Sequence, residues 1–442
     1  MTYDKMTGVT LEILQARLQT LGLTLPLSDN IKLLTQPLTL GSFQLNNRIA
    51  IQPMEGCDGA PDASPGELTI RRYHRFAQSG AGLIWFEATA VVPEGRANPR
   101  QLMLTKDNVD HYKKLLNDMR EASLKEYGYA PMILTQLTHS GRYSKPQGVS
   151  APIAARHNAI YDQNKPLDES RIVTDEYLDT LPAYYAQAAK LAQQAGFDGV
   201  DIKACHGYLV SELLGAHTRP GKYGGSYENR TRLYLDAIRA AQAAVQGEFH
   251  IATRINGYDG LPFPWGFGTS EGAAEEDLAE PIRLISTLHK ELGVQLINLT
   301  IGNPYFNPHI NRPYDDGPVP SPEHPLTGVA RIVRCTQAIK AAVPGITMMS
   351  SGNSYLRALA PNLAAGMLEG GHADLIGFGR QAFAYPTFAR DLLTQGQMQP
   401  RACCLSCSKC SELMRGSTAG CPVRDSQVYA PLYTQLRKGG KS

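Results

Sequence analysis

The chain has 442 residues and a formal net charge of +2; 43% of its residues are hydrophobic and 19% are charged. This length and apolar content suffice for one large domain or two ordinary ones. The small net charge and the absence of blocks of like charge argue against nucleic-acid binding. No run approaches the roughly 18 apolar residues of a membrane span, and no signal-like segment begins the chain. We therefore expect a cytoplasmic protein that acts on a small molecule.

Eight short apolar runs alternate with helix-like segments, which is the pattern of βα units in a parallel sheet. Two of these helices have clear caps, Thr174 before one that ends at Gly196 and Ser226 before another. Eight such units predict a closed TIM (β/α)₈ barrel rather than an open sheet. The runs are Arg48–Met54, Leu83–Val91, Met132–Ser140, Gly199–His206, His250–Asn256, Leu296–Gly302, Ile346–Gly352 and Asp374–Arg380.

The chain divides into three parts on this pattern. Residues 1–35 form an apolar-periodic N-terminal extension that either packs outside the barrel or mediates association. Residues 36–395 are the expected barrel, and residues 396–442 form a Cys-rich tail. Long loops rich in Pro and Gly follow the third, fifth and sixth strands, at the strand ends where barrel enzymes place their active sites. These loops are residues 141–171, 257–270 and 303–325.

Three proton-bearing side chains gather in the segment GVDIKACHGYL: Lys203, His206 and Tyr208. Lys or His can hold a developing enolate oxygen, and a Tyr at hydrogen-bond distance can deliver a proton to carbon. An equally open alternative is structural, with Lys203 paired to Asp201 inside the barrel and Tyr208 capping the pair. The spacing alone does not choose between them.

The segment from Phe197 to Arg230 resembles the signature of the old yellow enzyme family, in the branch that includes the 2,4-dienoyl-CoA reductases. Other motifs of the family occur in the same order: NRIAIQPM, EATAVVPEGR, QLTHSGR, TRIN, SSGN and GFGR. Together they span about residues 31 to 392. The resemblance implies that FMN binds at the C-terminal face of the barrel.

The family's flavin contacts carry over to residues of this sequence that match its motifs. Pro53 and Met54 would lie against the isoalloxazine ring, Ala88 near its edge, and Gln136 on its pyrimidine ring. Arg254 would lie near flavin N1 and O2, where a fixed positive charge favours the anionic reduced flavin. The phosphate would be held after the seventh and eighth strands by Gly352, Asn353, Gly379 and Arg380.

The resemblance also assigns the catalytic side chains. Tyr208 matches the family's proton donor, and His206 matches the residue that binds the substrate carbonyl oxygen or an anion. Lys203 departs from the pattern, in which His is common, and this is compatible with a substrate that carries a carboxylate or another anionic group. Glu55 and Cys57 also depart, because they stand where a Cys, Thr or His is usual near the flavin.

Five of the eight cysteines lie between Cys403 and Cys421. The spacing Cys404-x₂-Cys407-x₂-Cys410-x₁₀-Cys421 suits a [4Fe–4S] cluster, with zinc as the main alternative and Cys403 as a substitute for Cys404. The dienoyl-CoA reductase branch has a comparable tail with slightly longer spacing. No GxGxxG motif follows a strand here. NAD(P)H would therefore bind transiently at the barrel mouth, or a separate electron-transfer protein would supply electrons through the cluster.

These features predict an FMN-dependent oxidoreductase. Reduced FMN would give a hydride to the β-carbon of an activated alkene, an enone or enoate, and Tyr208 would protonate the α-carbon. The same geometry run backwards would make a dehydrogenase. Two further alternatives are a flavin-free lyase or isomerase with Lys203 as Schiff-base amine and a metal-stapled barrel that only binds. We expect a homo-oligomer.

Overall fold

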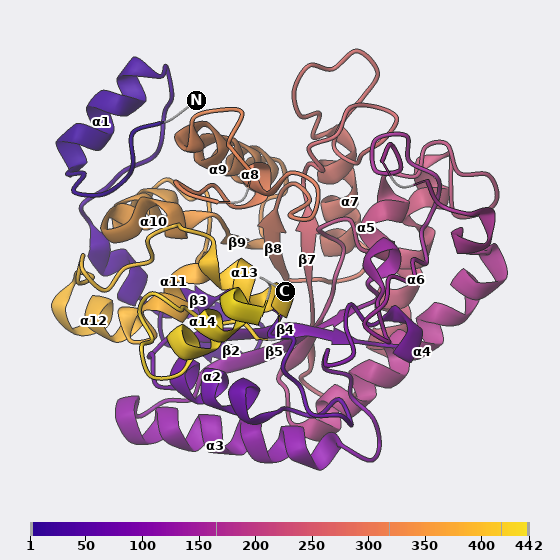
Figure 1. Ribbon diagram of the computed structural model, residues 1–442, viewed down its shortest axis with the longest axis horizontal. Coiled ribbons are helices and arrows are strands. Elements are labelled where there is room, and N and C mark those ends of the chain that lie inside the picture. Colours follow the sequence, from indigo (N-terminus) through magenta and orange to yellow (C-terminus); the bar gives the residue numbers. More distant parts are fainter. Residues whose placement is uncertain (1–2, 165, 318, 417, 440–442) are drawn as a thin grey trace.

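Eight parallel strands close into a barrel in the computed structural model, which describes residues 3–164, 166–317, 319–416 and 418–439. The strand order around the barrel is β10-β3-β4-β5-β6-β7-β8-β9, so neighbours in sequence are neighbours in space (Figure 1). The predicted TIM barrel is confirmed. The strands are β3 (Ile49–Ile51), β4 (Leu83–Ala90), β5 (Met132–Thr138), β6 (Gly199–Ile202), β7 (His250–Asn256), β8 (Leu296–Thr300), β9 (Thr347–Ser350) and β10 (Leu375–Phe378).

Each predicted run contains its strand, but most strands stop before the run does. The predicted run from Gly199 to His206, for example, holds only the four residues of β6, and Lys203 is the first residue after the strand. The polar ends of the runs are therefore loop residues at the C-terminal mouth. In a strand, successive side chains point alternately into and out of the barrel. Residues beyond the strand's end do not follow this alternation, so their side chains can face the centre of the barrel.

Helices cover the outside of the barrel and bury the outer faces of its strands. The Thr174 hydroxyl accepts from Tyr177 N at 3.2 Å at the start of α4, and Gly196 ends that helix with a φ of 92°. Ser226 caps α6 through Asn229 N. Both predicted caps are confirmed. The covering helices are α2 (Glu67–Ala77), α3 (Val109–Tyr127), α4 (Asp175–Ala195), α5 (Leu209–Leu214), α6 (Tyr227–Ala244), α7 (Ala279–Lys290), α8 (Pro308–Asn311), α9 (Pro325–Ala342), α10 (Ala360–Glu369), α11 (Arg380–Ala384) and α12 (Phe388–Gln395).

The barrel interior is packed with apolar side chains toward its N-terminal end. Trp85, Leu134 and Met349 are buried there in one cluster with Leu40 and Leu45. These two leucines belong to an antiparallel hairpin, β1 (Leu38–Leu40) and β2 (Phe43–Leu45), which the sequence analysis missed. The hairpin's leucines therefore extend the apolar core of the barrel interior, which is a packed core rather than a pore.

The N-terminal extension packs on the outside of the barrel. It holds α1 (Leu11–Thr20) and the 3₁₀ turn η1 (Ile31–Thr35). Ser28 N donates to Asn362 O at 3.0 Å, and a Cβ on Gly366 would meet Pro26 O at 2.1 Å, so the extension lies tightly against α10. The division of the chain at residues 35 and 395 stays a prediction.

The Cys-rich tail lies against α2 and α11 and contains α13 (Lys409–Gly416) and α14 (Tyr429–Gly439) (Figure 1, yellow). Asp425 fixes it to α2, because its carboxylate accepts from Arg71 at 2.7 Å and from Arg75 at 2.6 Å. The tail is thus part of the barrel's wall rather than a loose appendage.

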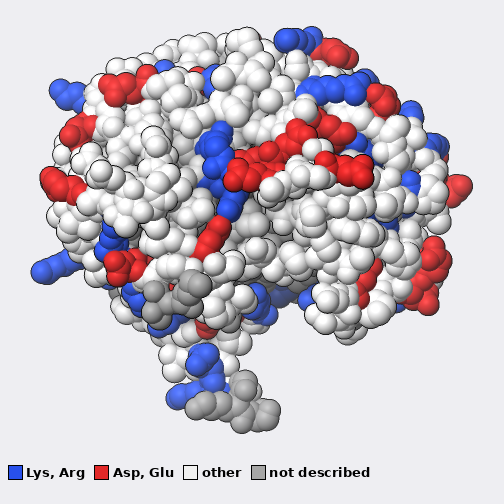
Figure 2. Space-filling model, turned by 90° about the horizontal axis from the view of Figure 1, so that it is seen from above, with Lys and Arg blue, Asp and Glu red and all other residues white. Residues whose placement is uncertain are grey.

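None of the described helices is long and apolar enough to cross a membrane. Figure 2 shows that, on the face it draws, acidic side chains gather beside basic ones. One such pairing on the surface of the protein joins Arg334 to both Glu275 and Glu276, although Figure 2 does not label it. This face therefore offers no extended basic surface of the kind that binds nucleic acid.

Candidate active site

A cavity of about 1300 Å³, open to solvent, lies at the C-terminal ends of the strands. The strand ends line it with all the predicted catalytic and flavin-binding residues except Asn353. These are Lys203, His206, Tyr208, Pro53, Met54, Ala88, Gln136, Arg254, Gly352, Gly379 and Arg380. Residues from seven distant segments of sequence therefore converge on one space, as barrel topology requires.

The phosphate role predicted for Asn353 stays a prediction. Its side chain does not line the cavity and instead donates to Ser350 Oγ at 3.1 Å and to Gly377 O at 3.2 Å. Asn353 thus joins the ends of β9 and β10. It holds the loop after β9 in place, while Gly352, with a φ of 81°, forms the turn beside the cavity.

Asp201 organises the polar floor of the cavity. Its carboxylate accepts from Gln136 Nε2 at 2.7 Å and from Arg254 N at 2.7 Å. The same carboxylate also accepts a hydrogen bond from Trp85 Nε1 at 2.9 Å. Burial raises the pKa of Asp201 to about 6, although these hydrogen bonds oppose the shift. In the described chain, Lys203 is not among the hydrogen-bond donors to Asp201.

Three polar atoms on the cavity wall are buried without a hydrogen-bond partner in the described chain: Arg254 Nε, Ser351 Oγ and Arg380 Nη1. Buried polar groups are normally satisfied, so unpaired donors that line a cavity indicate a ligand. FMN has carbonyl oxygens and a phosphate that would accept from such donors. The residues present therefore fit the cofactor that the family motifs imply.

The HGY turn carries the proton-bearing groups. Tyr208 is 1% exposed, and its hydroxyl lies 3.2 Å from Glu55 Oε2 and 2.8 Å from the Tyr305 hydroxyl. The Lys203 ammonium lies over the Tyr208 ring, 3.6 Å from its centroid. Burial lowers the pKa of Lys203 and raises the pKa of Tyr208 well above its ordinary value. Tyr208 is therefore a neutral phenol at physiological pH.

His206 is held in a strained backbone conformation, with a φ of 68°. Asn311 Nδ2 lies 3.1 Å from its Nε2, an arrangement that suits a neutral ring with the proton on Nδ1. Burial holds the pKa of His206 well below its ordinary value, and Arg254 and Lys203 add to this effect. His206 can thus donate a hydrogen bond to a carbonyl oxygen without carrying charge.

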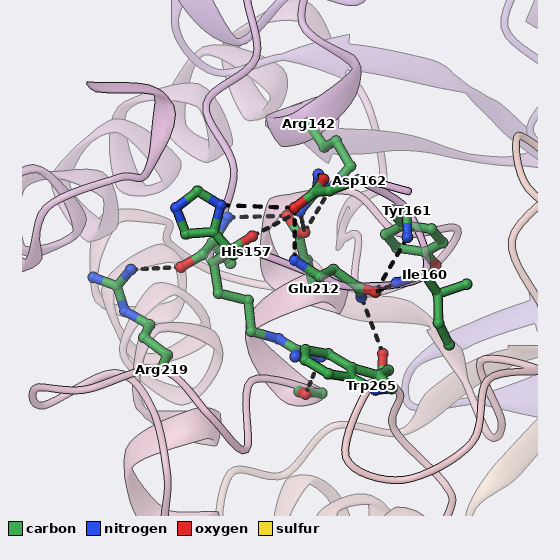
Figure 3. A network of polar contacts seen from close by, with 12 residues as sticks. Arg142, His157, Ile160, Tyr161, Asp162, Glu212, Arg219 and Trp265 are labelled. Atoms are coloured by element: carbon green, nitrogen blue, oxygen red, sulfur yellow. Dashed lines mark hydrogen bonds and ion pairs between the residues drawn. The ribbon is translucent and has the colours of Figure 1, made fainter. Parts of the chain in front are cut away.

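The loop after β5 is fixed beside the HGY turn by a buried ion network (Figure 3). Arg142 donates to Asp162 at 2.5 Å and to Glu212 at 2.7 Å, and the side chains of Arg142 and Glu212 are only 8% and 2% exposed. The Arg156 guanidinium lies over the Trp265 ring, 5.2 Å from its centroid. Because Glu212 belongs to α5, which directly follows Tyr208, this network fixes the helix that carries the HGY turn.

Several residues of the site were not expected from the sequence. Arg312 lines the cavity beside Arg380, and burial together with the charge of Arg380 lowers its pKa to about 10. Asn311 and Tyr305 come from the same loop, residues 303–325, which the sequence analysis named without selecting its functional residues. Arg415 reaches the cavity from α13 of the tail.

Four tail cysteines line a second cavity of about 340 Å³: Cys404, Cys407, Cys410 and Cys421. Cys403 does not line it, and its thiol instead donates to Gln399 O at 3.4 Å. Among the described residues, no three His, Cys, Asp or Glu side chains approach closely enough to share one metal ion. Cys410 lines both cavities, so the two spaces are adjacent.

Comparison with known proteins decides the family. The model of the NADH:flavin oxidoreductase / NADH oxidase family matches residues 33–297. The chain belongs to this family. It is 29% identical to an NADPH dehydrogenase of Bacillus subtilis (strain 168) over 366 residues, which cover 81% of the chain and 94% of the relative. It is 33% identical to an NADPH dehydrogenase of Bacillus pumilus over 274 residues, 61% of the chain and 73% of the relative.

Solved structures show the same fold. The old yellow enzyme homologue from Zymomonas mobilis matches with a TM-score of 0.62 at 24% identity, over 83% of this chain and 94% of that one. A 2-naphthoyl-CoA reductase complex matches with a TM-score of 0.73 at 18% identity, over 91% of this chain but only 58% of that one.

The predicted membership of the old yellow enzyme family is therefore confirmed, and this family member is an enzyme of the NAD(P)H:flavin oxidoreductase type. FMN and NAD(P)H fit the family, which favours flavin-dependent redox chemistry over the flavin-free lyase or isomerase. The 2,4-dienoyl-CoA reductase branch stays a prediction.

Proposed function

We propose that the enzyme binds FMN in the large cavity and reduces an activated alkene, an enone or enoate, with electrons from NAD(P)H. The observation that carries the proposal is that two features occur in the same cavity. Unpaired buried donors of Arg254, Ser351 and Arg380 face the cavity, and the Tyr208 hydroxyl lies in the same cavity. The first feature suits an anionic cofactor and the second suits proton delivery.

The residues that would hold FMN follow from the placement of charge. Lys203, Arg254, Arg312, Arg380 and Arg415 line the cavity, whereas Glu55 is its single lining carboxylate in the described chain. This excess of positive charge suits a phosphate at Arg380, Ser351 and Gly352 and a ring system near Arg254 and Gln136. Bound there, FMN would take a hydride from NAD(P)H and give it to the electron-poor carbon of the alkene.

The chain's own residues would bind the alkene and complete its reduction. His206 would donate from Nδ1 to the substrate carbonyl oxygen, because Asn311 already occupies its Nε2. The Tyr208 hydroxyl would give its proton to the α-carbon. Tyr208 is buried, and surroundings of low dielectric strengthen hydrogen bonds to a developing enolate.

We further propose that Cys404, Cys407, Cys410 and Cys421 hold a [4Fe–4S] cluster that exchanges single electrons with the flavin. A zinc ion needs its four sulfurs about 2.3 Å from one point. A cubane cluster binds each thiolate at a separate iron, and these four cysteines line one small pocket. Cys410 lines both cavities, as do Arg380 and Phe383, so the proposed centres would be neighbours.

A separate electron-transfer protein would then be a second electron source beside NAD(P)H. A metal reductase of Desulforamulus reducens is 27% identical over 84% of this chain and 50% of that protein. We also propose that the enzyme belongs to the 2,4-dienoyl-CoA reductase branch, is located in the cytoplasm and forms a homo-oligomer. The same site could also catalyse the reverse reaction, the dehydrogenation of a saturated substrate.

Anaerobic purification tests the proposal. The protein should be yellow to brown, should release FMN on denaturation, and should contain about four irons per chain. It should also oxidise NAD(P)H in the presence of an enone. A colourless protein that cannot be reconstituted with FMN would refute the flavin assignment, and zinc in place of iron would refute the cluster.

A further inference from the structure

Glu55 contacts the proposed proton donor, Tyr208, directly, although the flavin chemistry described above makes no use of it. Its Oε2 lies 3.2 Å from the Tyr208 hydroxyl, and its Oε1 accepts from Asn98 Nδ2 at 3.1 Å. The hydroxyl has one other partner in the described chain, the Tyr305 hydroxyl at 2.8 Å. Tyr208 is thus hydrogen-bonded to one carboxyl and one phenol.

The two partners differ in their ability to supply a proton. A phenol is a weak acid, and burial raises the pKa of Tyr305 further above its ordinary value. A carboxyl is a far stronger acid, and burial raises the pKa of Glu55 from its ordinary value, against the opposing charge of Lys203. General acids work best when their pKa lies near the operating pH. Glu55 is therefore the stronger acid of the two groups that contact the Tyr208 hydroxyl.

Tyr208 needs such a partner. Burial raises the pKa of Tyr208 well above its ordinary value, so an isolated tyrosinate would be costly in this site. If Tyr208 gave up its proton alone, the charge would stay on the phenolate. A neighbouring acid that replaces the proton in the same step removes that cost.

We propose that Glu55 supplies the proton that Tyr208 passes to the substrate, so that the two residues form a relay from carboxyl to phenol to carbon. This rests on the proposed alkene reduction. After hydride addition, the electron pair of the enolate forms the new C–H bond at the α-carbon as the Tyr208 O–H bond breaks. The Glu55 O–H bond breaks as the Tyr208 O–H bond is remade, and the negative charge ends on the Glu55 carboxylate.

The surroundings of Glu55 suit both its protonated carboxyl and its ionised carboxylate. The 3.2 Å contact joins two oxygens, so a protonated Glu55 can donate across it as well as accept. The carboxylate formed in the step keeps the hydrogen bond from Asn98 and faces the positive charge of Lys203. Because Glu55 lines the open cavity, solvent can return the proton once the product leaves.

The test is the alkene half-reaction, followed by stopped-flow absorbance after the reduced enzyme is mixed with 2-cyclohexenone. Glu55→Gln keeps the shape and the Asn98 contact region but cannot release a proton. Its rate should fall roughly 10²- to 10⁴-fold, the range for a lost general acid. Glu55→Asp should restore part of the rate. Reoxidation by ferricyanide, which needs no carbon protonation, should lose far less in Glu55→Gln.

The pH dependence adds a readout that a structural role would not move. The titratable groups that face Glu55 are Lys203, Tyr208, Tyr305 and Cys57. The wild-type rate should fall as the pH rises through the pKa of Glu55, and this limb should vanish in Glu55→Gln but persist in Tyr305→Phe. Persistence of the limb in Glu55→Gln would assign it to Lys203 and overturn the relay.

The variants also separate the relay from the proposed function. A slow Tyr208→Phe beside a Glu55→Gln that turns over normally would overturn the relay and leave Tyr208 as donor. Normal rates in both variants would overturn the relay together with the assignment of Tyr208 itself. A Tyr305→Phe variant as slow as Tyr208→Phe, with Glu55→Gln unaffected, would place the proton source at Tyr305 instead.

Discussion

Arg72 and Asp58 form a bidentate ion pair inside the wall of the barrel, with nitrogen to oxygen distances of 2.7 and 2.8 Å. Their side chains are 2% and 1% exposed. Thr418 donates its hydroxyl to the same Asp58 carboxylate, and Arg72 also donates to Ala419 O at 3.3 Å. Since Thr418 and Ala419 belong to the Cys-rich tail, the pair fastens the tail to the barrel.

Thr418→Val should loosen this attachment. Valine keeps the shape of threonine but removes a hydrogen bond to a buried carboxylate, which is worth about 1.5 to 3 kcal/mol. The free energy of unfolding should fall by that order, and limited proteolysis should cut the tail faster. Thr434→Val is the matched control, because within the described chain the Thr434 hydroxyl donates to Ala430 O on an exposed turn of α14. Equal behaviour of the two variants would show that the tail is held by other contacts.

Arg380→Ala should weaken the retention of FMN. The variant removes the guanidinium whose Nη1 has no partner in the described chain, and loss of one member of a buried charge pair costs about 2 to 5 kcal/mol. Equilibrium dialysis with fluorescence detection of free flavin should therefore show a Kd raised by roughly 30- to several thousand-fold. Arg334→Ala, on an exposed surface, is the control. Unchanged occupancy in Arg380→Ala would refute the phosphate assignment.

Adjacent cysteines in the tail give a matched pair for the cluster. Cys404 lines the small cavity and Cys403 does not, so Cys404→Ser should lose iron while Cys403→Ser retains about four irons per chain. Iron analysis and the paramagnetic signal of the dithionite-reduced protein measure the difference. FMN should remain bound in both variants. Loss of iron from Cys403→Ser alone would show that Cys403, and not Cys404, is the ligand. Zinc in the wild type would show that the tail holds a structural metal ion instead of a cluster.

Asp201 should make stability depend on pH. Its pKa is raised to about 6 in the folded state by burial, against about 3.9 in an unfolded chain. A raised carboxyl pKa means that the folded state binds the proton more tightly, so its contribution is present below pH ~4 and is lost as the pH rises toward 6, by up to ~3 kcal/mol. Denaturant unfolding between pH 4 and 7 should therefore show a flatter profile for Asp201→Asn than for the wild type. Parallel profiles would assign the titration elsewhere.

The sequence predicted the features that depend on local signals or on family motifs. Thr174 and Ser226 could be recognised as caps because the capped N–H groups lie three residues away. The β1–β2 hairpin was missed, although Gly41 and Ser42 between two apolar runs are a hairpin signal. Strands of three residues are too short for a periodic pattern to stand out.

Other parts of the site depend on contacts across the fold. Arg312 reaches Ser411, 99 residues away, and only the closed barrel brings them together. The spacing of the tail cysteines does not distinguish Cys403 from Cys404 as a metal ligand. Adjacent side chains differ only in the direction that the folded backbone gives them. The contact of Glu55 with Tyr208 joins residues 153 apart, so no pattern in the sequence could pair them.

Stopped-flow comparison of the two half-reactions in the wild type and Tyr208→Phe tests the central claim most directly. Phenylalanine keeps the ring beneath the Lys203 ammonium and removes only the hydroxyl. Reduction of the bound flavin by NAD(P)H should proceed at nearly the wild-type rate, while reoxidation by an enone should slow by roughly 10²- to 10⁴-fold. Equal slowing of both half-reactions, or of neither, would contradict the account of Tyr208 as the proton donor of a flavin-dependent alkene reductase.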